Sequence, residues 1–162
     1  MYNRSLAVEY AQKWALSRNP NYYNFDALGG DCTNFISQCL YAGSGVMNYT
    51  PDTGWYYFSL NNRSAAWTGV DFLYRFLTTN TGPGPYGTLL PLQYAIPGDV
   101  IQLSFNNNTF SHSLLVTYTD TYQNTDSILV AAHTNDALNR PITSYNYQVA
   151  RLIHIQNVNP GE

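Results

Sequence analysis

The sequence predicts an α+β domain in which N-terminal helices pack on a C-terminal antiparallel β-sheet. Before the Gly82-Pro83-Gly84-Pro85 segment, apolar residues recur at helical spacing; after it, short apolar runs alternate with polar residues and turns. A length of 162 residues fits one folded unit. We therefore expect a single monomeric domain over residues 1–162.

Three helices are expected in the first half of the chain. Each joins a 3.6-residue apolar period to a recognisable start or stop. The first covers residues 3–18 with Asn3 as its cap, and Asn19-Pro20 ends it. The second runs from Asp31 or Cys32 to Gly43; the third opens at Thr68 with a capping-box-like Thr68–Asp71 pair and buries Phe72, Leu73, Phe76 and Leu77.

The rest of the chain predicts a long loop and a β meander. Residues 44–62 are irregular and carry the aromatic cluster 55–58. Alternating or short apolar segments bounded by turn residues predict antiparallel strands joined by hairpin-like turns. These strands are expected over residues 100–105, 112–119, 127–133 and 145–156.

Composition excludes several classes of protein. A net charge of −3 with seven basic residues leaves no basic face for nucleic acid. The longest apolar run, residues 128–132, is far below the ~20 residues of a membrane span. Two cysteines and three histidines at these spacings do not form a zinc site, so we expect no metal and no cofactor. No signal peptide is visible, but the lysine-poor, Asn- and Tyr-rich composition is typical of exported Gram-positive domains, and we expect an extracellular or cell-wall location for an excised domain.

Cys32 is the candidate nucleophile. It stands at the start of the second helix, directly after Gly29-Gly30-Asp31, where free N–H groups and the helix dipole favour a thiolate. With a histidine nearby, such thiols have pKa values of roughly 3.5–7.5. The alternative is a small buried apolar residue, which is the commoner role of a free cysteine. Cys39, ~10.5 Å further along the helix, is beyond disulfide reach and is assigned to the core.

Two histidines are candidate partners of the thiol. His112 opens one expected strand and His133 closes the next. If these strands are antiparallel neighbours, both imidazoles meet at one edge of the sheet, where a helix carrying Cys32 would supply the thiol. Each histidine alone could equally be a hydrogen-bonded residue at a strand end. His154 lies within a strand and is interpreted as structural.

The string Gly-Gly-Asp-Cys-Thr-Asn-Phe at 29–35, the Pro97-Gly98-Asp99 strand before His112, and the Ala-His-Thr-Asn string at 132–135 resemble the bacterial putative amidase domain family. That family is similar to the NlpC-like and CHAP cysteine peptidases of the papain-like superfamily. The resemblance runs from about residue 2 to 155 and implies a papain-like fold.

The resemblance also implies roles for individual residues. Cys32 would be the nucleophile, His112 the general base and acid, and His133 the residue that orients His112, with Asn135 or Asp136 as alternatives for this third role. The papain-like pattern has an oxyanion-hole glutamine six residues before the cysteine, but this chain has Asp26 at that position. The hole would then use the Cys32 N–H and a donor from the preceding loop. The candidates for that donor are Tyr22, Tyr23 and Asn24. Asp31 and Asn34 have sufficient roles in capping the helix and are not assigned to catalysis.

The expected activity is hydrolysis of an amide bond, and the resemblance suggests peptidoglycan or a peptide as substrate. Trp55 and Tyr56, in the aromatic loop, are candidate substrate contacts. The alternative is a catalytically weak or inactive module that binds wall glycan or peptide, which the departure at Asp26 favours. A glycosidase is nearly excluded because the only glutamates are Glu9 and Glu162.

Overall fold

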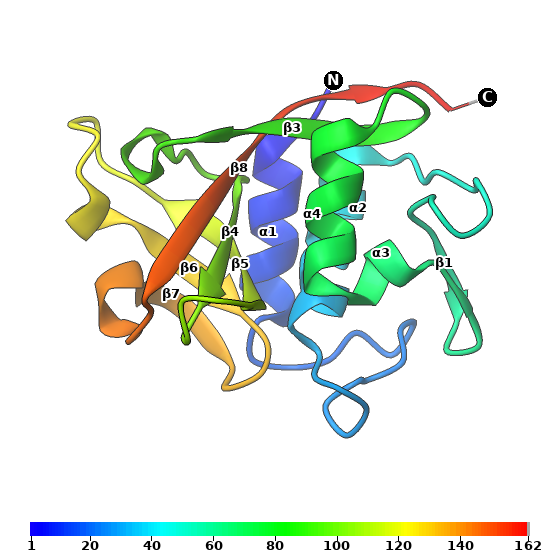
Figure 1. The fold of residues 1–162 in the computed structure, drawn as a ribbon, viewed down its shortest axis with the longest axis horizontal. Coiled ribbons are helices and arrows are strands. Elements are labelled where there is room, and N and C mark those ends of the chain that lie inside the picture. Colours follow the sequence, from blue (N-terminus) through cyan, green and yellow to red (C-terminus); the bar gives the residue numbers. More distant parts are fainter. Residues whose placement is uncertain (162) are drawn as a thin grey trace.

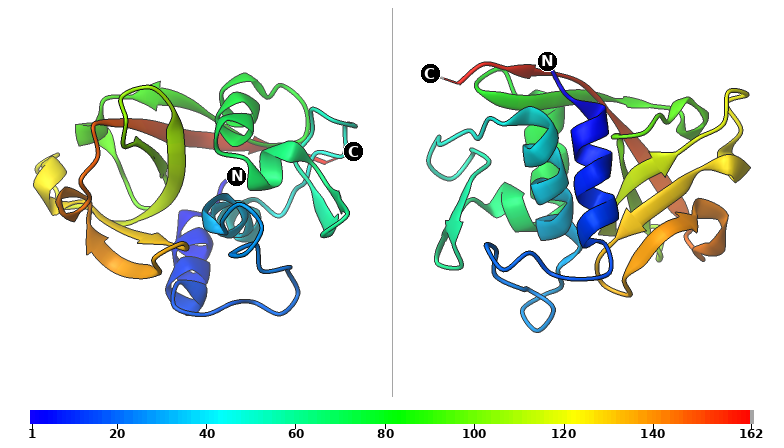
Figure 2. Two further views of the ribbon diagram at one scale, coloured as in Figure 1. Left: turned by 60° about the horizontal axis from the view of Figure 1, so that its bottom comes forward. Right: turned by 180° about the vertical axis from the view of Figure 1, so that it is seen from behind.

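A computed structural model describes residues 1–161 as helices from the N-terminal half packed against a sheet from the C-terminal half (Figure 1). This arrangement confirms the α+β prediction. α1 and α2 lie side by side in contact and α2 also packs on the sheet (Figure 2). The helices are α1 (Arg4–Trp14), α2 (Cys32–Ser44), α3 (Ala65–Thr68) and α4 (Val70–Thr79), with short 3₁₀ helices at Leu92–Tyr94, Thr125–Ser127 and Ile142–Ser144.

The sheet is antiparallel, with strand order β3-β8-β4-β5-β6-β7. The expected simple meander is therefore wrong, because the last strand inserts between β3 and β4. β3 was not predicted because the Gly82-Pro83-Gly84-Pro85 segment was interpreted as a break in the chain. An edge strand, however, tolerates glycine and proline. The strands are β3 (Gly84–Leu90), β4 (Val100–Ser104), β5 (Phe110–Tyr118), β6 (Leu129–Ala132), β7 (Ala137–Pro141) and β8 (Val149–Asn159), and a separate hairpin pairs β1 (Tyr57–Ser59) with β2 (Asn62–Arg63).

The ends of the first two helices differ from the predictions. Asn3 does cap α1, accepting from the Leu6 N–H at 3.1 Å, but the helix ends at Trp14 rather than residue 18. The Trp14 carbonyl instead faces an imidazole nitrogen of His133 at 2.7 Å. α2 passes Gly43 and ends before Gly45, whose φ of 67° is the left-handed conformation that glycine favours.

The expected third helix is split into two. α3 ends at Thr68, Gly69 has an extended φ of −108°, and α4 begins at Val70 without a side-chain cap, so the Thr68–Asp71 capping pair is wrong. α4 buries Leu73, Phe76 and Leu77 as expected, whereas Phe72 is 51% exposed.

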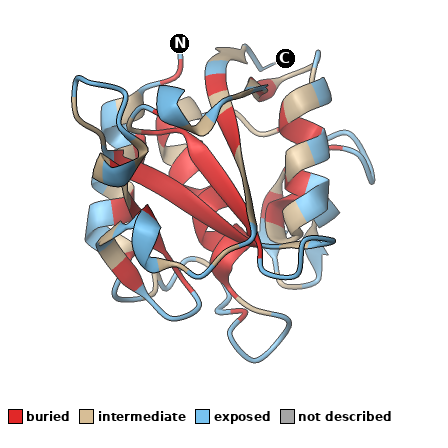
Figure 3. Ribbon diagram, turned by 60° about the vertical axis from the view of Figure 1, so that its left-hand side comes forward, coloured by how far each residue is buried: buried red, intermediate tan, exposed pale blue. Residues whose placement is uncertain are grey.

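Apolar side chains fill both faces of the sheet, and its central strands are buried (Figure 3). Leu115 and Ala131 lie on the face that packs against the helices, while Leu114 and Val116 lie in a second cluster on the opposite face. From His112 onward, where the pairing of β5 with β4 is regular, this alternation fixes which face each side chain occupies. Within residues 1–161, no helix is long and apolar enough to cross a membrane.

Candidate active site

Cys32 is the first residue of α2, as predicted. Gly29 and Gly30, with φ of 88° and 101°, turn the chain into this helix start. The thiol is 8% exposed, and its sulfur lies 3.7 Å from the Thr33 hydroxyl and 4.0 Å from the carbonyl oxygen of Ser111. The sulfur therefore sits between the helix start and the first residues of β5.

A chain of polar side chains runs from the surface to this sulfur. The Arg151 guanidinium can only donate, so it fixes the Gln102 amide with Oε1 toward Arg151 at 2.6 and 2.9 Å. The Gln102 Nε2 therefore donates to Ser113 Oγ at 3.2 Å, and Ser113 Oγ lies 3.0 Å from Thr33 Oγ1. The Ser113 and Thr33 hydroxyls can each donate and accept, so the chain joins Gln102 to Cys32 Sγ through two hydroxyl groups that can rotate.

His112 lies on β5 one residue beyond the carbonyl that the sulfur contacts. Its side chain is 7% exposed and makes no hydrogen bond within the described residues 1–161. It lines a cavity of about 380 Å³ together with Ser111 and Asn135. Burial and the nearby positive charge of Arg140 lower the pKa of His112 to about 4, so the ring is neutral and able to accept a proton at pH 7.

The structure places Cys32 and His112 at the same end of β5 but does not join them. Ser113 points toward the helices and contacts Thr33, so alternation directs His112 toward the opposite face. No hydrogen bond links the sulfur to the imidazole in the part of the chain described. Cys32 therefore lies close to the backbone next to His112, as predicted, whereas a contact between the thiol and the imidazole stays a prediction.

The expected meeting of the two imidazoles is wrong. β5 and β6 pair with Leu115 opposite Ala131, so His133 shares the helix-facing side of the sheet, where it stacks on Phe35 with ring centroids 4.0 Å apart. His112 lies on the other side. Both nitrogens of His133 are already engaged, by Asp31 at 2.5 Å and by the Trp14 carbonyl at 2.7 Å. His133 therefore does not orient His112 in this structure.

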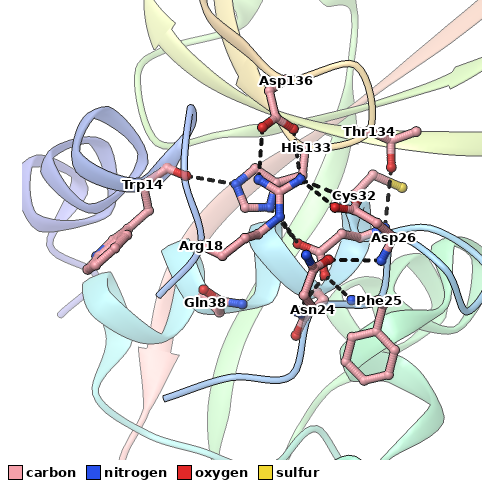
Figure 4. A network of polar contacts seen from close by, with 12 residues as sticks. Trp14, Arg18, Asn24, Phe25, Asp26, Cys32, Gln38, His133, Thr134 and Asp136 are labelled. Carbon is pink, nitrogen blue, oxygen red and sulfur yellow. Dashed lines mark hydrogen bonds and ion pairs between the residues drawn. The ribbon is translucent and has the colours of Figure 1, made fainter. Parts of the chain in front are cut away.

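His133 instead belongs to a buried ionic network around Asp31 (Figure 4). Its Nδ1 faces the Asp31 carboxylate and its Nε2 faces the Trp14 carbonyl oxygen. Burial favours a raised pKa for Asp31, but hydrogen bonds from His133, the Phe25 N–H and Asn34 outweigh it and lower that pKa. The expectation that Asp31 merely caps α2 is wrong, since it makes no capping bond.

Arg18 extends this network to the surface. Its guanidinium binds both oxygens of Asp136 at 2.8 and 2.9 Å and contacts Asp26 at 2.9 Å, and its Nε lies 3.5 Å from Asp31. Asp136, an alternative for the third catalytic residue, and Asp26, at the position of the papain-like glutamine, both bind Arg18. In Figure 4 the Cys32 sulfur points away from the His133 ring. The network holds the loop before α2 and the turn after β6 against each other.

The candidate substrate contacts separate into buried and exposed residues. Trp55 is fully buried, and its indole N–H donates to Ser37 at 3.0 Å, so its expected role in substrate binding is wrong. The Tyr23 N–H donates to the Tyr57 hydroxyl at 2.8 Å and is not a free oxyanion donor. Tyr22 stacks between Tyr57 and Trp67, with ring centroids 5.0 and 6.1 Å away.

Asn24, Tyr23 and Tyr56 keep accessible side chains. Asn24 is exposed and uses its carbonyl oxygen to accept from the Asp26 N–H at 2.9 Å. The Tyr23 side chain is 42% exposed. Tyr56 is half-buried beside Tyr49 and Phe58, with ring centroids 6.1 and 5.8 Å away. Contact of these side chains with substrate stays a prediction.

Several residues near the site were missed from sequence. Arg18, Arg140 and Tyr145 lie outside every motif, and only the folded chain brings them to the start of α2 or to the His112 cavity. Gln102 carried a usable signal, because a polar residue within the apolar run of β4 requires a hydrogen-bond partner.

We expect the free energy of unfolding to fall as the pH is lowered from about 6.5 to about 4. In the unfolded chain His112 binds a proton below its ordinary pKa of 6.5, whereas in the folded protein it does so only below about 4. The unfolded state therefore holds more protons in this window, and acid removes about 3 kcal/mol of stability. Urea denaturation at pH 7 and pH 4.5 measures the change. His112→Gln should lose most of the dependence; an unchanged dependence in that variant contradicts a buried neutral His112.

The chain belongs to the Putative amidase domain family, whose model matches residues 1–156. It is 34% identical over 122 residues to the Uncharacterized protein YhbB of Bacillus subtilis (strain 168), an alignment covering 74% of this chain and 38% of that protein. The chain thus spans well under half the length of this relative. No solved structure matches it. Family membership suggests hydrolysis of amide bonds.

Proposed function

We propose that this protein is a cysteine amidase or peptidase that cleaves an amide bond of bacterial peptidoglycan outside the cell. The observation that carries the proposal is the Cys32 sulfur at the start of α2, 3.7 Å from the Thr33 hydroxyl and 4.0 Å from the carbonyl oxygen of Ser111, the residue before His112. Family membership supports amide chemistry, and the lysine-poor composition supports export.

In the proposed reaction, His112 takes the thiol proton and the Cys32 sulfur attacks the amide carbonyl carbon. The C–N bond of the tetrahedral intermediate breaks as His112 gives that proton to the leaving amine, which leaves a thioester on Cys32. Water, activated by neutral His112, then attacks the thioester and releases the acid and the thiol. The reaction needs no redox partner or additional base.

The thiol–imidazole contact would form as substrate binds. Catalytic hydrogen bonds are often long or absent in unliganded enzymes and tighten in the substrate complex. His112 has no competing hydrogen-bond partner in residues 1–161, and its neutral state suits a base that waits for the thiol proton. A papain-like arrangement of helix and strand is part of this proposal.

We propose Asn135 as the third polar residue, because it lines the His112 cavity, while His133 and Asp136 are engaged elsewhere. The oxyanion would be held by the Cys32 N–H and by the side-chain amide of Asn24, which lies on the exposed loop before α2. Asp26, at the position of the papain-like glutamine, is bound to Arg18 and does not supply a donor.

A digest of purified peptidoglycan, read by mass spectrometry, tests the substrate class. We expect soluble fragments with a new amine and a new carboxyl group. Cleavage between glycan and peptide and cleavage within the peptide leave different fragments, so the same experiment identifies the bond. A digest identical to a no-protein control contradicts the peptidoglycan substrate.

A second candidate is a wall-binding module, favoured by an exposed aromatic cluster on the loop and hairpin before α3. Tyr49 and Phe58 are 59% and 60% exposed and stack with ring centroids 5.5 Å apart. Exposed rings of this kind suit stacking on sugars or peptides. Sedimentation of Cys32→Ala with insoluble peptidoglycan, compared with a Tyr49→Ser, Phe58→Ser double variant, distinguishes binding through this cluster from binding at the thiol.

A further inference from the structure

The cavity beside His112 is polar and carries a single permanent charge. It encloses about 380 Å³, and Arg140 is the only lining residue with a formal charge at pH 7, because His112 is neutral there. No carboxylate of the described residues lines it. The cavity is therefore electropositive in a protein whose net charge is −3, which favours an anionic ligand.

Arg140 is held in place from two sides. Its Nε donates to Ser144 Oγ at 2.7 Å, its Nη2 donates to the Ser144 carbonyl at 3.1 Å, and its guanidinium carbon lies 3.7 Å from the centre of the Tyr145 ring. Nη1 makes no hydrogen bond to any residue that the structure describes. Because the guanidinium is already held in place, the binding of an acceptor to its unused N–H group would cost little additional side-chain entropy.

Two further polar groups of the cavity also lack partners. The Tyr145 hydroxyl is buried and makes no hydrogen bond within residues 1–161, and burial raises its pKa, so it keeps its proton. The His112 ring, 5.9 Å from the Tyr145 ring, has no partner either. Buried polar groups are nearly always satisfied, and an exception needs an explanation.

We propose that this cavity binds a carboxylate of the substrate through Arg140 and Tyr145. A carboxylate brings a negative charge and two acceptor oxygens to Arg140 and Tyr145, whereas a carboxamide is neutral and its N–H₂ group cannot donate to the Arg140 guanidinium, which has no acceptor. The ligand class is an acyclic peptide acid or acidic side chain. The preferred substrate is an amide with a free carboxylate next to the scissile bond.

The cavity shares lining residues with the surroundings of the thiol, although Cys32 itself does not line it. It is lined by Ser111, whose carbonyl oxygen is 4.0 Å from Cys32 Sγ, and by Thr134, whose hydroxyl accepts from the Asp31 N–H at 3.3 Å. A bound carboxylate would also offset the positive charge of Arg140 that opposes protonation of His112. Binding of an acidic substrate would thus favour the proton transfer from Cys32 to His112 in the proposed function, on which this assignment of substrate class rests.

The test is an NMR titration of the Cys32→Ala variant with N-acetyl-Ala-Ala and with its C-terminal amide at fixed ionic strength. We expect the acid to bind at least about fivefold more tightly than the amide, with the largest shifts at His112 and Tyr145. Arg140→Gln should reduce the preference to less than about twofold. Arg75→Gln is the matched control: Arg75 stacks on Phe72 at 5.5 Å in a different cavity, and its variant removes the same charge. That control should keep the preference.

Equal affinity for acid and amide, or a preference that survives Arg140→Gln, overturns the inference. If Arg140→Gln does not fold, Tyr145→Phe is the test variant, because it keeps the ring under Arg140 and removes only the hydroxyl. An unchanged preference for the acid over the amide in Tyr145→Phe contradicts carboxylate binding by Arg140 and Tyr145. The titration needs no turnover. A carboxylate preference without any hydrolysis by the wild-type protein would contradict the proposed function and leave the carboxylate subsite intact. Hydrolysis without a carboxylate preference would support the proposed function and contradict the subsite.

Discussion

Replacing Cys32 with alanine should reduce amide hydrolysis by at least about a thousandfold while shifting the melting temperature by no more than a few degrees. The sulfur is the proposed nucleophile, and no other described residue can replace it at the start of α2. Its contacts are long, 3.7 Å to Thr33 and 4.0 Å to Ser111, so its removal disturbs little packing. Fragment release from peptidoglycan and a thermal melt measure the two effects.

Cys39→Ala is the control for this variant. Cys39 lies on the same helix, is fully buried, and has a pKa raised well above its ordinary value by burial. Its replacement should leave hydrolysis intact and cost about 1 kcal/mol of stability through a small cavity. Hydrolysis that persists in Cys32→Ala would show that the sulfur is not the nucleophile.

Asp31→Asn should lower the free energy of unfolding by about 3–5 kcal/mol, the largest stability effect that we expect of a single side chain near the site. The substitution keeps the shape of Asp31 but removes the buried carboxylate charge that faces His133 and Arg18. Breaking a buried pair by removing one partner leaves the other partner without compensation, which is the costly product. In a chain of this length the loss corresponds to a fall of about 10 °C in melting temperature.

Asp26→Asn provides the matched comparison. Asp26 also binds Arg18, at 2.9 Å, but its side chain is 46% exposed, and a surface pair of this kind contributes less than about 1 kcal/mol. A double Asp31→Asn, His133→Gln variant should regain part of the lost stability because it replaces both members of the buried pair. Similar melting temperatures for the Asp31 and Asp26 variants would contradict the role of the buried pair.

Much of the fold was predictable because local signals agreed with it. Asn3, the apolar period of α2 and the run of β4 each point to the element that forms. The failures arose where tertiary contacts overrode local pattern. His133 takes the Trp14 carbonyl and α1 ends early, Gly43 is required for close packing against Tyr2 rather than for a stop, and β3 forms from glycines and prolines because β8 pairs with it.

The candidate site was predictable in its elements and not in its contacts. The Gly-Gly-Asp-Cys string does place Cys32 at a helix start, and His112 lies on the strand beside it, although that strand begins at Phe110 rather than at His112. Which face each histidine occupies depends on the pairing of Leu115 with Ala131, a register that the sequence leaves open. The ionic network of Asp31, His133 and Arg18 joins residues more than 100 positions apart and has no sequence pattern.

The claim on which this account depends is that Cys32, and not Cys39, is the reactive cysteine of this protein. Alkylation by iodoacetamide at pH 6–7, followed by peptide mass mapping, measures it directly because only the thiolate reacts. The account predicts rapid, selective labelling of Cys32, with Cys39 modified only after unfolding. Equal and slow labelling of both cysteines would contradict it.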